Sequence, residues 1–183
     1  MKQLNRDNSD LIRQAMEGDI AAFEKLVLNY QDKMFAVANT ILENRYDAQD
    51  VVQEAFIKAF LSIKNLKTEY AFYQWLLRIT INKALDEKNR NTNRNRSLLR
   101  ENCFSHTVNA GKDYVETLVS NNQIRQALTS LSPAHRAVLI LREVEGLSYA
   151  EIGDILNIPV GTVRSRLNHA RLRLKESFLE LEL

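Results

Sequence analysis

Hydrophobic residues recur at helical spacing through the first half of the chain. Apolar side chains three or four positions apart run through residues 23–41, 52–63 and 72–85, and no window shows sustained strand-like alternation. Asp47 is predicted to cap the second of these helices, with Asp50 in its first turn. The chain has only five glycines and two prolines. The pattern therefore predicts an all-α fold.

The helical periodicity stops in the middle of the chain. Residues 89–118 are rich in Asn, Arg, Ser and Thr, and apolar side chains there seldom recur at helical intervals. Such a composition is typical of a flexible linker. Apolar periodicity returns after residue 120. We therefore expect two small helical domains joined by a flexible linker, with a first domain over 1–90, the linker over 91–119 and a second domain over 120–183.

The second domain has clear helix boundaries. Ser132 is predicted to cap a helix that begins at Pro133 and ends before Gly146. Ser148 and Glu151 have the spacing of a capping box, which predicts a short helix. The stretch "NIPVG" then predicts a tight turn, and a longer helix follows it. Two helices joined by a tight turn form a helix-turn-helix.

The last helix is predicted to have two different faces. Val163, Leu167, Ala170 and Leu174 share one face, which should pack on the preceding helices. The remaining side chains are polar or cationic and suit the major groove of DNA, where they can contact bases and phosphates. These candidate DNA-binding residues are Thr162, Arg164, Ser165, Arg166, Asn168, His169 and Arg171. The alternative is a solvated surface helix.

Charge supports contact with a polyanion at two places. The formal net charge of the 183 residues is only +2, but the segments 88–100 and 161–175 are rich in Lys and Arg and contain no acid. No zinc-type spacing of Cys and His occurs, Cys103 is the single cysteine, and no catalytic triad or phosphate-binding glycine loop is present. We expect no metal, no cofactor and no enzyme activity.

The N-terminal half carries two further candidate surfaces. Asp50, Gln53, Glu54 and Ile57 should share an acidic face opposite the buried Val52, Ala55, Phe56 and Phe60. An acidic face repels nucleic acid, so it favours a basic protein partner, or else it is simply solvated. Between residues 69 and 90, aromatic and cationic side chains alternate, which suits single-stranded DNA, although Phe72 and Trp75 could instead belong to the core.

Three motifs together resemble a known family. "DAQDVVQEAFIKAF", "AFYQWLLRITINKA" and "LSYAEIGDILNIPVGTVRSRLNHARLRL" are similar to a bacterial extracytoplasmic-function (ECF, group 4) RNA polymerase sigma factor of the sigma-70 family. The resemblance implies sigma domain 2, a linker and a helix-turn-helix sigma domain 4. It also implies promoter-specific transcription initiation through −10 and −35 elements.

The resemblance assigns roles by position. The acidic face would dock on the β′ clamp helices of core RNA polymerase, and domain 4 would contact the β flap. The matching −10 residues are Phe72, Tyr73, Trp75, Arg78, Ile79, Asn82 and Lys83. The last helix would read the −35 element of promoter DNA. An anti-sigma factor is the expected regulator.

Two other function classes fit part of the sequence. A stand-alone DNA-binding regulator would explain the second domain and leave the acidic face without a purpose. An adaptor that binds polymerase alone would leave Arg164 and Arg166 unexplained. For all three classes the polar N-terminus "MKQLNRDNSD" and the lack of an apolar run of about 20 residues predict a cytoplasmic protein without membrane insertion.

Overall fold

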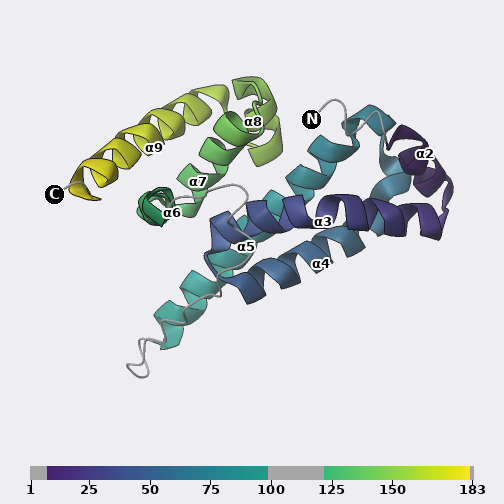
Figure 1. The fold of residues 1–183 in the computed structure, drawn as a ribbon, viewed down its shortest axis with the longest axis horizontal. Coiled ribbons are helices and arrows are strands. Elements are labelled where there is room, and N and C mark those ends of the chain that lie inside the picture. The colour runs from purple at the N-terminus through teal and green to yellow at the C-terminus, as the bar shows by residue number, and fades with distance from the viewer. Residues whose placement is uncertain (1–7, 99–121, 182–183) are drawn as a thin grey trace.

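Two groups of helices make up the described part of the chain (Figure 1). The computed structural model describes residues 8–98 and 122–181. Within those ranges every regular element is a helix, which confirms the predicted all-α fold. The predicted linker lies largely outside them.

The N-terminal domain is a bundle of four helices. Its elements are α2 (Ser9–Glu17), α3 (Ile20–Leu42), α4 (Arg45–Ser62) and α5 (Phe72–Leu98), with short 3₁₀ turns at Ile63–Asn65 and Glu69–Ala71. The predicted apolar stripes meet in the core, where Leu26, Tyr30, Met34, Leu76 and Leu77 are fully buried. Burial of these side chains is what stabilises the bundle.

Asn44, rather than Asp47, caps α4. Glu43 ends α3 with a left-handed backbone (φ 60°), so Asn44 is the first extended residue, and its side chain accepts hydrogen bonds from the backbone N–H of Tyr46 and Asp47. Asn and Asp cap helices about equally well, so the sequence did not distinguish them. Asp47 lies in the first turn instead, where its carboxylate accepts a 3.0 Å hydrogen bond from Asn91.

The helix α5 continues beyond residue 90. It runs to Leu98, and its extension is anchored on α4 by the bond between Asn91 and Asp47. The extension contains neither Gly nor Pro, and adding residues to an existing helix is much easier than starting one. The end of α5 therefore does not coincide with the predicted end of the first domain.

The C-terminal domain contains the predicted helix-turn-helix. Its elements are α6 (Asn122–Thr129), α7 (Pro133–Leu139) with a π-helical continuation (Ile140–Val144), α8 (Tyr149–Leu156) and α9 (Val160–Leu181). The Ser132 cap and the Ser148–Glu151 capping box are both formed. Within α8, Gly153 lets the turn to α9 pack closely, because a Cβ atom at this position would lie 2.9 Å from the carbonyl oxygen of Ile158.

The two domains pack against each other. Figure 1 shows α7 and α8 above the N-terminal bundle, where α7 contacts α3 and α8 contacts α5. The sequence did not predict this contact, since it joins residues far apart in the chain.

Candidate nucleic-acid interface

The two predicted faces of α9 are confirmed. Val163, Leu167 and Ala170 are fully buried, and Leu174 is half-buried against the same core. On the other side Arg164, Ser165, Asn168, His169 and Arg171 are exposed, and Thr162 and Arg166 are half-buried. The helix therefore presents a long polar and cationic surface away from the core.

The arginines on this surface differ in their partners. Arg171 is ion-paired with Glu143, with 2.6 Å between Nη2 and Oε1. Among the described residues, neither Arg164 nor Arg166 has an ion pair, so both guanidinium groups are available to an anionic ligand. Ser165 donates to the carbonyl of Thr162 at 3.0 Å.

The acidic face of α4 is exposed as predicted. Asp50, Gln53 and Glu54 face solvent, and the side chain of Ile57 is 60% exposed. Lys83 of α5 donates to Glu54 at 2.6 Å, and this hydrogen bond, together with the charge of Lys83, lowers the pKa of Glu54. Glu54 therefore stays ionised well below neutral pH.

Phe60 was expected in the core beneath this face, and that expectation is wrong. Its side chain is 42% exposed, and its ring packs edge-on against Phe23 with 5.1 Å between centroids. Ala59 takes the buried position at this level of the helix. The buried apolar stripe of α4 therefore continues through Ala59 to Ile63, and Phe60 lies at its edge.

The predicted −10 residues of α5 are covered to different degrees. Arg78 is exposed, and Trp75, Asn82 and Lys83 are half-buried. Tyr73 and Ile79 are each 8% exposed. Burial therefore separates the seven residues into accessible and covered groups.

Phe72 belongs to the hydrophobic core. It is completely buried, and its ring lies 5.4 Å from that of Tyr30 and 6.0 Å from that of Trp75. Phe72 is therefore a core residue, which is the alternative that the sequence left open. A fully buried ring cannot stack on a base in this structure.

The C-terminal domain binds the polar ends of several α5 side chains. The hydroxyl of Tyr73 donates to Glu145 at 2.8 Å, the amide of Asn82 donates to the carbonyl of Ile155 at 3.4 Å, and Gln74 donates to Glu151 at 3.1 Å. Sequence reasoning missed Gln74, which has no motif of its own. These bonds place α8 and the segment before it over the candidate −10 surface.

Both halves of the chain match families of known function. The Sigma-70 region 2 family model matches residues 26–94, and the Sigma-70, region 4 model matches residues 121–174. The ECF RNA polymerase sigma factor SigW of Bacillus subtilis is 34% identical over 93% of this chain and 96% of its own length. This chain belongs to the ECF RNA polymerase sigma factors. It is thus an alternative sigma factor that binds core RNA polymerase and directs promoter-specific transcription initiation, and it is not itself an enzyme.

Other relatives agree with this assignment. The RNA polymerase sigma-H factor of Pseudomonas aeruginosa is 38% identical, with 90% of each chain covered, and the sigma-E factor of Escherichia coli K12 is 36% identical, with 88% of each covered. Two solved structures share the fold. They are CnrH in complex with the cytosolic domain of CnrY (TM-score 0.64, 24% identity, 96% and 99% coverage) and RpoE in complex with the anti-sigma factor NepR from Bartonella quintana (TM-score 0.68, 22% identity, 90% and 100% coverage).

A histidine pair lies beside the polar face of α9 in this sigma factor. The rings of His135 and His169 stack with 4.7 Å between centroids, and Nδ1 of His135 lies 2.6 Å from Oγ of Ser132. Burial, with smaller effects of His169 and Arg166, lowers the pKa of His135. A neutral His135 therefore positions the exposed ring of His169. The sequence alone gave His135 no role.

Burial also shifts the pKa values of Tyr73 and Glu145, which are hydrogen-bonded to each other across the two domains of this sigma factor. It raises the pKa of Tyr73, and the nearby Glu145 carboxylate raises it further. Burial raises the pKa of Glu145 too, although the hydrogen bond from Tyr73 partly opposes the shift. Both groups therefore favour their neutral forms more than they would in water.

Residues 8–98 and 122–181 contain neither a candidate metal site nor a candidate membrane span. In those ranges no three His, Cys, Asp or Glu side chains are grouped so that they could hold a metal ion. No helix there is both long and apolar enough to cross a bilayer. Cys103 lies outside the described residues.

Proposed function

We propose that three surfaces of this sigma factor divide the work of promoter recognition: α4 docks on core polymerase, α5 reads the −10 element and α9 reads the −35 element. In this proposal residues 1–90 supply the first two functions, residues 91–119 tether the domains, and residues 120–183 supply the third. The observation that carries the proposal is the exposure of an acidic face on α4 and a cationic face on α9, in separate domains.

The α4 face suits a protein partner. Asp50, Gln53 and Glu54 surround the largely exposed side chain of Ile57. An apolar anchor within charged groups is the usual composition of a protein interface, and the acidic charge repels DNA. We assign this face to the β′ clamp helices, and contacts with the β flap to the C-terminal domain.

The α5 surface suits an opened DNA strand. Trp75, Ile79 and Asn82 offer stacking, apolar and hydrogen-bonding contacts, while Arg78 and Lys83 supply cations for phosphates. A stacked base contributes about 1–3 kcal/mol, and taking a base out of a duplex costs a few kcal/mol, so such a surface can hold a flipped base. Tyr73, Ile79 and Asn82 become available once the C-terminal domain moves off α5, and Phe72 supports the surface from the core.

The α9 surface suits the major groove. Its N-terminal half carries the exposed Arg164 and Ser165 and the half-buried Arg166. Such side chains reach base edges when a recognition helix enters the groove. Each DNA contact is weak by itself. Tethering makes the second contact intramolecular once the first has formed, so both elements together are bound much more tightly than either alone.

Reconstituted transcription tests this proposal. Core polymerase, the purified chain and a genomic DNA library are combined, and start sites are mapped by run-off. A sigma factor gives defined start sites without any other initiation factor. A stand-alone regulator would need a second sigma factor, and an adaptor would give no start sites.

Two substitutions then separate the surfaces. Ile57→Asp is expected to abolish binding to core polymerase, and Arg166→Ala is expected to preserve that binding while weakening promoter binding. If Ile57→Asp left polymerase binding intact, the assignment of α4 would be wrong.

An anti-sigma factor is the proposed regulator of this cytoplasmic protein. An apolar groove of about 490 Å³ is lined by both domains, with Val37 and Thr40 from α3 and with Leu128, Leu139 and Leu174 from α6, α7 and α9. A partner seated there would hold the two domains together. Purification of the tagged chain at native expression tests this idea, and recovery of the chain without any stoichiometric inhibitor of its transcription activity would count against it.

A further inference from the structure

We propose that the free sigma factor is held closed by Arg136, which binds the C-terminal end of α3 and keeps the C-terminal domain over the surface that reads the −10 element. This inference rests on the proposed function of α5. The closed arrangement and the reading of DNA by α5 exclude each other, so the contact must open during initiation.

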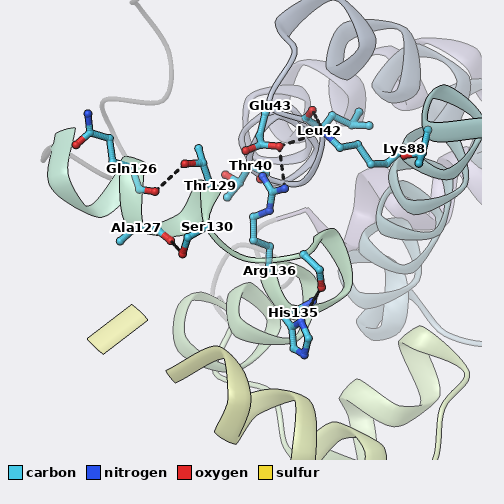
Figure 2. Close-up of polar contacts among 12 residues, drawn as sticks. Thr40, Leu42, Glu43, Lys88, Gln126, Ala127, Thr129, Ser130, His135 and Arg136 are labelled. Carbon is cyan, nitrogen blue, oxygen red and sulfur yellow. Dashed lines mark hydrogen bonds and ion pairs between the residues drawn. The ribbon is translucent and has the colours of Figure 1, made fainter. Parts of the chain in front are cut away.

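Arg136 reaches from one domain into the other. It lies in α7, and only 2% of the residue is exposed. Its Nη1 donates to the carbonyl oxygen of Thr40 at 3.1 Å and its Nη2 to Oε2 of Glu43 at 2.8 Å (Figure 2). We call these two bonds the Arg136 contact. A buried guanidinium bonded to a carbonyl and a carboxylate is a charge-assisted interaction, which is stronger than a neutral hydrogen bond.

The end of α3 is well suited to receive a cation. The last carbonyls of a helix lack backbone partners and carry the negative end of the helix dipole. Lys88 of α5 already donates to the carbonyl of Leu42 at 2.9 Å and to Glu43 at 3.0 Å (Figure 2). One carboxylate is therefore shared between a cation of its own domain and a cation of the other domain. Only the second of these pairs depends on closure.

The Arg136 contact is strong in one respect and incomplete in another. A buried arginine that loses its carboxylate is left as an uncompensated charge, so neutralising Glu43 should sharply disfavour closure. In the described ranges, Nε of Arg136 is the one buried side-chain nitrogen or oxygen without a hydrogen-bond partner. That unmade bond makes the closed state less stable than full pairing would, which suits a contact that has to open.

Closure occupies the atoms that α5 would offer to DNA. The amide of Asn82 is bonded to Ile155, and the hydroxyl of Tyr73 is bonded to Glu145. Ile79 is 8% exposed beside them. A flipped base could reach none of these groups without displacing α8. The exposed faces of α4 and α9, in contrast, stay open to polymerase and to duplex DNA in the closed protein.

Distance measurement between spin labels tests the Arg136 contact directly. Labels are placed on the full chain at Leu28→Cys in α3 and Leu172→Cys in α9, which are 66% and 56% exposed, in a Cys103→Ser background. The free protein is expected to show a single narrow distribution of distances. Glu43→Gln and Arg136→Gln are each expected to broaden this distribution, because either change removes the charge pair between the domains.

Lys88→Gln is the matched control. This substitution removes Lys88, the partner of Glu43 within the N-terminal domain, and leaves Arg136 in place. The narrow distribution of distances should therefore be retained. The inference would be overturned if Glu43→Gln kept the wild-type distance distribution. Glu43→Gln stays decisive even if Arg136→Gln melts, because Glu43 is partly exposed and glutamine keeps its shape. Circular dichroism confirms that each labelled variant is folded.

Binding of a single-stranded oligonucleotide that carries the −10 element separates this inference from the proposed function. If about nine molecules in ten are closed, opening should raise the apparent affinity about tenfold, since only open molecules bind. Glu43→Gln should show this gain and Lys88→Gln should not. Variants that open without any gain would leave the Arg136 contact standing and refute the assignment of the −10 surface to α5.

Discussion

Arg166→Ala gives the sharpest test of how α9 reads DNA. Arg166 lies three residues after the buried Val163, half-buried at the edge of the polar face of α9. It has no carboxylate partner among the described residues, so its removal breaks no ion pair within that part of the protein. A bidentate contact with a base contributes about 1–3 kcal/mol. We therefore expect promoter affinity to fall between about fivefold and 150-fold, at tenfold for each 1.4 kcal/mol.

Arg171→Ala is the matched comparison. Arg171 is already paired with Glu143 at 2.6 Å, so a contact with phosphate would first break an ion pair. Exposed ion pairs are worth roughly 0–1 kcal/mol, which is comparable to one phosphate contact at physiological salt, so the net loss should be about threefold or less.

The assay measures equilibrium binding of holoenzyme to a labelled promoter identified by run-off transcription. A second duplex has a scrambled −35 element, and both are titrated at several salt concentrations. Arg166→Ala should reduce the preference for the promoter over the scrambled duplex, whereas Arg171→Ala should weaken both alike. An equal loss on the two duplexes for Arg166→Ala would mean that Arg166 contacts phosphate. A larger loss for Arg171→Ala than for Arg166→Ala would refute the argument from the ion pair.

Three further outcomes follow from the structure. Leu167→Ala should lower the free energy of unfolding by about 2–5 kcal/mol, measured by denaturant titration, because this fully buried side chain joins α9 to its domain. Burial raises the pKa of Glu145 above its unfolded value, so its contribution to stability is present at low pH and is lost as pH rises through the raised pKa. Glu145→Gln, which still accepts from Tyr73, should remove this dependence in thermal melts between about pH 4 and pH 7. Asn82→Ala should leave binding to core polymerase unchanged and slow open-complex formation about tenfold in permanganate footprinting, as loss of one base contact predicts. Unfolding of the Asn82→Ala domain would instead make Asn82 structural.

Local features of this sigma factor could be predicted from sequence because they depend on nearby residues. The cap at Ser132 and the capping box of Ser148 and Glu151 involve partners within one turn, and the buried face of α9 follows from apolar spacing within a single helix. Prediction was less certain where two choices were nearly equal in energy. Asn44 and Asp47 cap comparably well, and only the end of α3 at Glu43 decides between them.

The candidate −10 surface shows the limit of sequence reasoning. Motif positions identified Tyr73, Ile79 and Asn82, but only packing shows that Phe72 lies inside the core and that α8 covers the others. Aromatic and cationic residues alternate in the same way whether they face a ligand or a second domain. Only the structure could therefore show which of these side chains are exposed.

The sequence by itself determined the helical character of both domains, the caps at Ser132 and Ser148, the polar and apolar faces of α9, and membership of the sigma family. The tertiary structure decided that the domains close on each other through Arg136, Thr40 and Glu43. Arg136 and Glu43 are 93 positions apart, and such a contact leaves no trace in spacing or composition. It forms only because the two packed helical domains place a buried cation beside the carbonyl end of a helix.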